Sequence, residues 1–307
     1  MKTIIKDKFI EIISGNLKVV LSCLGAAITE IKYDDELMTL TPINYEDLNR
    51  EDIYYGKTIG PIANRIKDGL IVIDNKNYYL PLNEKGVCNH SGKVGLSNQI
   101  FDLSIEDGSV VFTYKDYMYD GEITYKVIYS FSIDDQIRID YKVTTTNKAV
   151  ISLANHTFFT LGESGIESLS LKIDANYFIE SDKETLLPLC VKPIISFLDF
   201  NKEKKITKDI NDPYLMDHRT KGYDHCFLLN KKEVVLNSPK YNLSIESNFP
   251  CVHIYSDNYA DGVLTKNTDL SIRRAIAIEP EDNLIEKTLI NKNEVYQRYI
   301  IYSFLKR

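Results

Sequence analysis

Hydrophobic and polar residues alternate with a period of two along most of this 307-residue chain, and sustained stretches with a helical period are nearly absent. The alternation predicts strands at residues 69–80, 109–114, 122–133, 136–146, 169–173, 234–236, 243–246, 252–255, 275–278 and 295–304. The first range reads as a hairpin with a polar turn at residues 74–77, and Asp134 and Asp135 separate two strands that we expect to pair. Many short strands joined by polar turns are typical of a sandwich or a barrel, so we expect an all-β protein.

Two segments interrupt the alternation, at residues 42–55 and 186–218, and we expect them to be irregular or helical. Neither has the Gly/Ser-rich or Pro-rich composition of a linker, and no repeat with a period of about 20–50 residues is visible. We therefore expect residues 1–307 to form a single β domain.

The composition narrows the possible partners. Hydrophobic residues make up 44% of the chain and charged residues 26%, which is ordinary for a globular protein. The formal net charge of -7, with lysines scattered among acidic residues, argues against nucleic acid or an anionic membrane as a partner. The longest run without Asp, Glu, Lys or Arg, residues 149–162, is shorter than the roughly 20 residues of a membrane helix. Because the N-terminus also mixes acidic and basic residues, unlike a signal peptide, we expect a cytoplasmic protein.

The five cysteines show neither the even count of a disulfide framework nor the spacing of a zinc site. They are Cys23, Cys88, Cys190, Cys226 and Cys251. We expect reduced thiols, with Cys226 and Cys251 as core residues in apolar strands. Two Asp-His pairs, at residues 217–218 and 224–225, also lack the spacing of a metal site, so we expect no metal.

Two titratable residues stand in apolar surroundings. His156 interrupts the apolar run of residues 151–161, and Glu279 ends the apolar run that begins at Ala275. One interpretation of His156 is a core histidine with both ring nitrogens hydrogen-bonded. The other is that an acid and a base, each on a rigid element, face each other across a pocket.

Five short segments concentrate polar groups in strand-like surroundings. They are Ala63-Asn64-Arg65-Ile66, Asn89-His90-Ser91-Gly92, Asn155-His156-Thr157, Gly222-Tyr223-Asp224-His225 and Ile278-Glu279-Pro280. Taken singly, each has a structural interpretation: Arg65 as an ion-pair partner, His90 as a turn residue and Asp224 as a capping carboxylate. The order and spacing of all five together resemble the aldose 1-epimerases, also called galactose mutarotases.

The resemblance implies a large antiparallel β-sandwich of the galactose mutarotase type, an isomerase that interconverts the α and β anomers of a free hexose. It implies that Glu279 is the general base for the C1 hydroxyl and that His156 is the general acid for the ring oxygen. The residues that it assigns to sugar binding are Asn64, Arg65, His90 and Asp224. The reaction implied needs no cofactor or metal, and the protein would be a monomer or a homodimer with a small sugar as its partner.

Histidine and glutamate suit this chemistry, because ring opening removes one proton and delivers another. Their reference pKa values, about 6.5 and 4.3, leave a narrow window in which the acid is protonated and the base is ionised. A carboxylate near His156 would raise the histidine pKa and widen that window, and Asp224 is the candidate.

Two alternatives remain open from the sequence. A hexose-6-phosphate 1-epimerase needs extra cations, and Arg273 and Arg274 are candidates, although strand alternation would send them to opposite faces. A non-catalytic carbohydrate-binding module on the same fold is the other, although the presence of all five polar segments argues against it. A glycoside hydrolase fits less well, because that chemistry usually needs two carboxylates.

Overall fold

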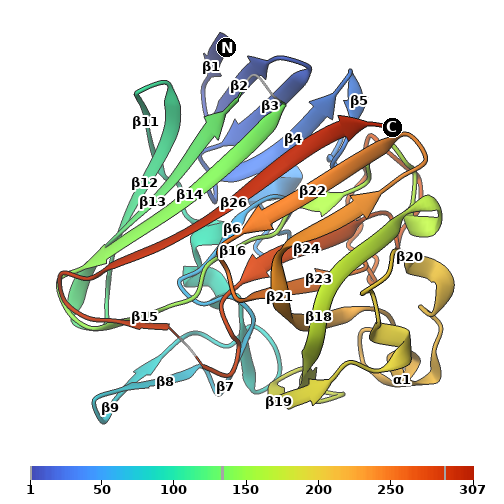
Figure 1. The fold of residues 1–307 in the computed structure, drawn as a ribbon. Coiled ribbons are helices and arrows are strands. Elements are labelled where there is room, and N and C mark those ends of the chain that lie inside the picture. Colours follow the sequence, from blue (N-terminus) through green and yellow to red (C-terminus); the bar gives the residue numbers. More distant parts are fainter. Residues whose placement is uncertain (1, 133–134, 287) are drawn as a thin grey trace.

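The computed structural model of the chain describes residues 2–132, 135–286 and 288–307. Its largest sheet has 13 strands and crosses the whole molecule (Figure 1). In spatial order its main path is β11 (Asp102–Glu106), β12 (Ser109–Met118), β13 (Gly121–Phe131), β14 (Gln136–Thr145), β26 (Val295–Lys306), β22 (Tyr241–Ser247), β21 (Asp224–Asn237), β23 (Cys251–Tyr255), β24 (Ile276–Glu281) and β17 (Phe158–Phe159). Off this path, β18 (Ser170–Ser181) pairs with β21, β19 (Pro188–Pro193) and β20 (Lys204–Lys205). Every pairing in this sheet is antiparallel.

A second sheet is a five-stranded meander at the N-terminus. Its strands are β1 (Lys2–Lys6), β2 (Phe9–Ser14), β3 (Leu17–Ser22), β4 (Ala27–Tyr33) and β5 (Glu36–Leu37). Four two-stranded sheets pair β7 (Arg65–Lys67) with β10 (Val87–Asn89), β8 (Leu70–Ile73) with β9 (Lys76–Tyr79), β6 (Thr58–Ile59) with β16 (Ala154–Asn155), and β15 (Ala149–Ile151) with β25 (Thr288–Ile290).

The described helices are all short. Six are 3-10 turns: η1 (Tyr45–Asn49), η2 (Gly92–Val94), η3 (Leu96–Asn98), η4 (Ile166–Ser168), η5 (Ser196–Leu198) and η6 (Ile206–Lys208). The α-helix α1 (Pro213–Asp217) begins after Asp212, whose carboxylate accepts a hydrogen bond from the Tyr214 N–H. Of the two segments expected to be irregular or helical, residues 42–55 contain η1. Residues 186–218 contain short strands and 3-10 turns, and α1 lies at their end.

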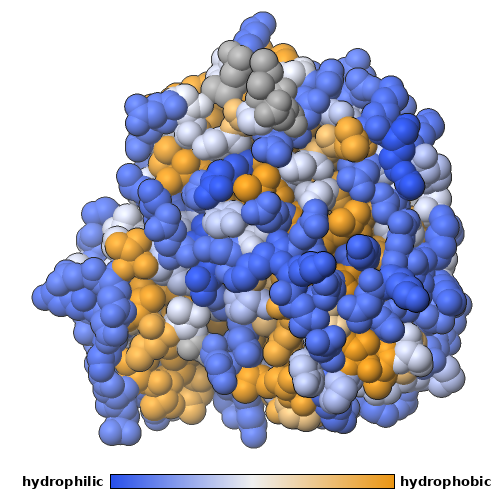
Figure 2. All heavy atoms as spheres, viewed as in Figure 1, coloured by the Kyte–Doolittle hydropathy of each residue, from blue (hydrophilic) through white to orange (hydrophobic). Residues whose placement is uncertain are grey.

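The core lies between the large sheet and the N-terminal meander. Alternate residues of β13 are buried, among them Tyr125 and Val127, and they belong to the same apolar cluster as Ile10 and Val19 of the meander. Outward-facing positions carry polar side chains, and Figure 2 shows hydrophilic residues over most of this face, with hydrophobic residues in scattered groups. The period-two pattern thus builds the all-β protein that it predicted, and the antiparallel sandwich is the one that the resemblance implied. Among the described residues, no helix has the length and apolar character needed to cross a membrane.

Three local expectations need correction. The hairpin turn is Asp74-Asn75 alone, because both residues adopt positive φ angles of 48° and 63° and let the strands close in two residues. The apolar run of residues 151–161 is three short strands rather than one, and His156 lies between the last two. Glu279 lies inside β24 rather than at its end. Residues 133 and 134, where a predicted strand and turn meet, lie outside the described residues.

Candidate active site

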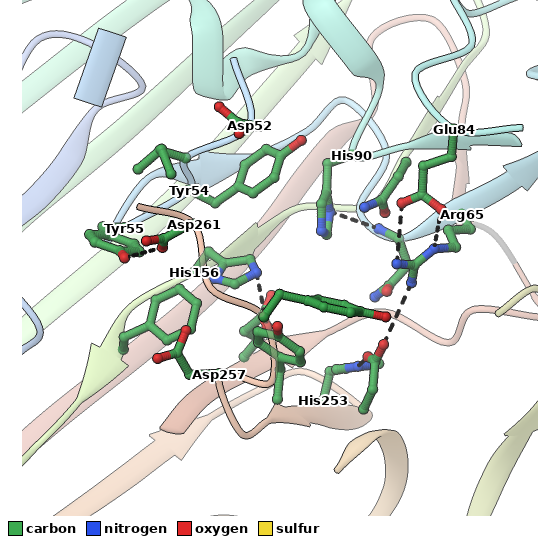
Figure 3. Close-up of a pocket in the computed structure, with 18 of the residues that line it drawn as sticks. Asp52, Tyr54, Tyr55, Arg65, Glu84, His90, His156, His253, Asp257 and Asp261 are labelled. Carbon is green, nitrogen blue, oxygen red and sulfur yellow. Dashed lines mark hydrogen bonds and ion pairs between the residues drawn. The ribbon is translucent and has the colours of Figure 1, made fainter. Parts of the chain in front are cut away.

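A cavity of about 520 Å³ opens where β21, β23 and β24 meet the loops around β7, β10 and β16. Its size is within the range of small-molecule sites. All six residues assigned by the resemblance line it, namely Asn64, Arg65, His90, His156, Asp224 and Glu279. Figure 3 shows His90, Arg65, His156 and His253 arranged around this space, although they come from distant parts of the chain.

The sheet presents one wall of the cavity as a regular grid. Across β21, β23 and β24, Cys226 pairs with His253, which pairs with Glu279. Because alternate residues of a strand share a face, Asp224 and Glu281 lie on the same side of the sheet as that row. The antiparallel register therefore brings three carboxylates and a histidine together on one face.

His156 and Glu279 face each other at the bottom of the cavity, and we call them the catalytic pair. Nε2 of His156 lies 3.4 Å from Oε1 of Glu279, and the two residues are only 6% and 2% exposed. Nδ1 of His156 has no hydrogen-bond partner among the described residues. A core histidine with both nitrogens satisfied is therefore not what the structure contains.

The His156 ring is enclosed by aromatic side chains. Its centroid lies 5.7 Å from Tyr54, 4.9 Å from Phe158 and 5.5 Å from His90. Burial in these surroundings lowers the pKa of His156 to about 3, and burial likewise raises the pKa of Glu279 well above its ordinary value. Before a ligand binds, both groups favour the neutral form, so the pair holds one proton in total.

The charge of Asp224 acts to raise the pKa of His156, as expected, but Asp224 is not hydrogen-bonded to that histidine. Asp224 Oδ1 instead accepts a hydrogen bond of 2.6 Å from His253 Nε2, and its other oxygen lies 3.9 Å from Arg65 Nη1. Burial acts to raise the pKa of Asp224, but the hydrogen bond and charge of His253 outweigh it and hold the pKa well below its usual value. The carboxylate stays ionised, and its influence on His156 is smaller than that of burial.

His90 is fixed by Asn64. The Asn64 N–H donates to Nδ1 of His90 at 3.2 Å, and the His90 N–H donates to the Asn64 carbonyl at 3.1 Å. Burial lowers the pKa of His90 well below its ordinary value, so the ring is neutral and its single proton sits on Nε2. Asn64 also donates its side-chain amide to Glu281 at 2.5 Å. His90 therefore offers a hydrogen-bond donor in a fixed orientation.

Arg65 is held by carboxylates on two sides. Its Nε and Nη2 donate to Glu84 at 3.2 Å and 3.3 Å, and Arg219 Nη2 donates to the same carboxylate at 2.6 Å. Burial acts to raise the pKa of Glu84, but the charge of Arg65 and the hydrogen bond of Arg219 lower it. The two guanidinium groups are thus anchored at the rim beside the catalytic pair.

Among the residues of the site that were not assigned from the sequence are His253 and Glu281. With Asp224 they form what we call the ion-paired triad, in which Nδ1 of His253 lies 3.4 Å from Oε1 of Glu281. The sequence offered one indication of Glu281: it follows Glu279 by two residues, and a strand places both side chains on one face. Spacing alone could not show which strand pairs with β24 and brings His253 beside these glutamates.

The same residues include a possible metal-binding group. Ligand atoms of Cys226, His253 and Glu281 lie within 4.8 Å of one another, and all three residues are buried. A ligating imidazole must be neutral, however, and the hydrogen bond of His253 to Asp224, together with the negative charge of Glu281, outweighs burial and raises the pKa of His253 to about 10. A proton therefore competes for the position that a metal would take.

Neither arginine considered for phosphate binding is available for it. Arg274 is 1% exposed and binds Asp257 through Nε at 2.6 Å and Asp261 through Nη2 at 2.8 Å. Arg273 bonds to Asn211 on the exposed surface. Arg274 instead neutralises two carboxylates of the cavity rim.

Comparisons with known proteins find relatives along most of the chain. The family model described as aldose 1-epimerase matches residues 8–303. The aldose 1-epimerase of Haemophilus influenzae is 27% identical over 241 residues, covering 71% of this chain and 68% of that protein. The galactose mutarotase of Rattus norvegicus is 24% identical over 278 residues, covering 84% and 79%. The crystal structure of galactose 1-epimerase from Lactobacillus acidophilus superposes with a TM-score of 0.87 at 24% identity, covering 100% of this chain and 98% of that one.

Proposed function

This chain belongs to the aldose 1-epimerase family of isomerases, and we propose that it interconverts the α and β anomers of a free hexose. The observation that carries the proposal is the catalytic pair, a buried imidazole and a buried carboxyl 3.4 Å apart that face one cavity and share one proton. Opening a hemiacetal ring needs this combination of one acceptor and one donor.

The proposed steps follow from that proton count. Glu279, ionised when His156 carries the proton, takes the proton of the C1 hydroxyl while the bond between C1 and the ring oxygen breaks. His156 delivers its proton to the ring oxygen, which becomes the C5 hydroxyl of the open-chain aldehyde. Rotation about the bond between C1 and C2 turns the other face of the carbonyl toward that hydroxyl. His156 then takes the C5 hydroxyl proton back, the ring closes, and Glu279 returns its proton to O1.

The remaining residues suit the binding of hydroxyl groups. His90, through Nε2–H, and the Arg65 guanidinium can donate hydrogen bonds to sugar hydroxyl groups. The ionised carboxylate of Asp224 can accept hydrogen bonds from them. Each is held by a partner outside the sugar position, so that little orientational freedom is lost when a ligand binds.

The charges of the cavity favour an unphosphorylated sugar. Its lining includes six carboxylates, which belong to Asp52, Glu84, Asp224, Asp257, Asp261 and Glu279. Its described lining contains no lysine, and both lining arginines, Arg65 and Arg219, already bind Glu84. A phosphate dianion would meet carboxylates and cations that are already paired with one another, with no free lysine or arginine among the described lining residues, so it would bind poorly.

The test is mutarotation of freshly dissolved α-glucose and α-galactose, followed by polarimetry or by a dehydrogenase specific for the β anomer. Glucose 6-phosphate and galactose 6-phosphate are run beside them, with Glu279→Gln as the inactive control. We expect rates above the spontaneous rate for at least one free aldose and a far lower kcat/KM for the phosphates.

Three outcomes contradict the proposal in different ways. No acceleration with any free aldose overturns it, and sugar binding without turnover identifies a binding module instead. A higher kcat/KM for a hexose phosphate than for the free sugar identifies the phosphate epimerase.

A further inference from the structure

His253 lies at the centre of the grid on the sheet wall, beside each of its three acids. Its Nε2 lies 2.6 Å from Asp224, its Nδ1 lies 3.4 Å from Glu281, and its cross-strand neighbour is Glu279. The residue is 6% exposed, so water does little to screen these charges.

Charge balance gives His253 its importance. Three carboxylates share this face of β21, β23 and β24: Glu279 and Glu281 are buried, and the Asp224 side chain is 9% exposed. Arg65 reaches Asp224 only at 3.9 Å and is shared with Glu84, while Glu281 receives a neutral amide from Asn64. Buried carboxylates without a cation are costly, and His253 is the cation positioned between two of them.

We propose that His253 is a positioning residue held as a cation between two carboxylates, and that its charge sets the pH range in which the catalytic pair carries one proton. This inference rests on the proposed function of His156 and Glu279. It concerns the two residues that support them, His253 and Glu281.

The other groups around His253 come from the neighbouring strands and from across the cavity. Cys226 faces it from β21, Glu279 and Glu281 face it from β24, and His156, His90 and Arg65 approach from the loops across the cavity. After burial, which raises the pKa of Glu279, the charge of His253 lowers it and that of Glu281 raises it. His253 also acts to lower the pKa of His156. The two members of the ion pair therefore pull the catalytic pair in opposite directions.

Because the charges of His253 and Glu281 act in opposite directions, the effect of each of three variants on the pH profile of kcat/KM can be stated in advance. Removing the cation in His253→Gln increases the proton affinity of the catalytic pair, so both limbs of the pH profile of kcat/KM move to higher pH, by about 1 unit or more. Removing the anion in Glu281→Gln moves both limbs to lower pH. Removing both charges in the double variant returns the limbs close to their wild-type positions, because the two effects oppose each other.

A matched control is His225→Gln. His225 is also buried and lies next to Asp224 on β21. Its ring packs against Phe178 and His218, and its Nδ1 accepts a hydrogen bond from the backbone N–H of Asp224 at 3.0 Å. Burial lowers its pKa to about 3, so it carries no charge to remove. We expect this variant to leave the pH profile where it is, even if it lowers the melting temperature.

A readout that needs no sugar separates this inference from the function. The chain has five histidines, so ¹⁵N-histidine NMR resolves each ring, with His253→Gln identifying the signal of His253. We expect one ring that is doubly protonated from pH 7 to pH 9 and absent from that variant. Dialysis against Zn²⁺ followed by metal analysis is run on the same sample.

The outcomes are distinct. A neutral His253 ring at pH 7, one bound Zn²⁺ that Cys226→Ser abolishes, or single variants whose limbs move in the same direction would each overturn the inference while the mutarotase function stands. A wild type that carries the imidazolium but accelerates no sugar would instead refute the proposed function.

Discussion

His156 and His253 are two buried histidines near Glu279, and their surroundings leave His156 neutral and His253 positively charged. His156 is enclosed by Tyr54, Phe158 and His90, and burial lowers its pKa to about 3. His253 is equally buried, but two carboxylates outweigh burial and raise its pKa to about 10. Burial alone therefore does not decide the state of a histidine; the partners of its two ring nitrogens decide it.

The comparison indicates that the two histidines have different roles. A histidine that must give up and regain a proton in each cycle benefits from surroundings that do not hold the proton firmly. A histidine that must keep its proton benefits from carboxylates near both nitrogens: Nε2 of His253 is hydrogen-bonded to Asp224 at 2.6 Å, and its Nδ1 lies 3.4 Å from Glu281. The following variants test whether these roles differ, starting with the largest expected effect.

Substitution of His156 and substitution of His253 should lower kcat by very different factors. His156→Asn removes the proton donor, so we expect kcat to fall about 10²- to 10⁴-fold at every pH, as positioned acid–base groups usually contribute. His253→Gln should cost less than about tenfold in kcat when each protein is measured at its own pH optimum. Polarimetry across the pH range measures both. Equal losses in the two variants would remove the distinction between donor and positioning residue.

The buried ion pair of Arg274 offers a comparison with His253, because a guanidinium keeps its charge throughout the accessible pH range. Arg274→Met leaves Asp257 and Asp261 without their cation, and we expect a loss of about 3–5 kcal/mol in the free energy of unfolding. Urea denaturation at pH 7 measures it. A loss below about 1 kcal/mol would mean that the cluster is solvated in solution, as an exposed pair would be.

Removing an aromatic neighbour should make His156 more like an ordinary histidine. Phe158→Leu takes away the ring whose centroid lies 4.9 Å from that imidazole and admits water, so the pKa of His156 should rise from about 3 toward its ordinary value by about 1 unit or more. The ¹⁵N-histidine titration measures the change, and the His253 signal serves as the internal reference. An unchanged His156 titration would show that the aromatic ring is not what excludes water.

The smallest change per pH unit is expected in the pH dependence of stability. Since the pKa of His253 is raised above its unfolded value, its stabilisation is complete below about pH 6.5 and is lost as the pH rises toward about 10. One proton corresponds to a slope of at most about 1.4 kcal/mol per pH unit over that range. Urea melts from pH 6 to pH 10 should show this slope in the wild type and a smaller one in His253→Gln. Arg274→Met should keep the wild-type slope, and its loss there would point to another titrating group.

Much of the fold followed from the alternation of residues. Strands such as β13 and β14 were located almost to the residue, because one face of each is buried and the period is two. Prediction failed where tertiary contacts override the local pattern. The run around His156 is apolar on both faces because it is buried on all sides, so its sequence could not show that the strand breaks there.

The sequence by itself determined the residues of the catalytic pair and their likeness to those of a known family, since local motifs survive as short strings such as Asn155-His156-Thr157. Only the tertiary structure decided their electrostatics. Asp224 was expected beside His156, but the register of β21, β23 and β24 pairs it with His253. A proton's position depends on distances of a few ångströms between groups far apart in the chain, and strand register sets those distances.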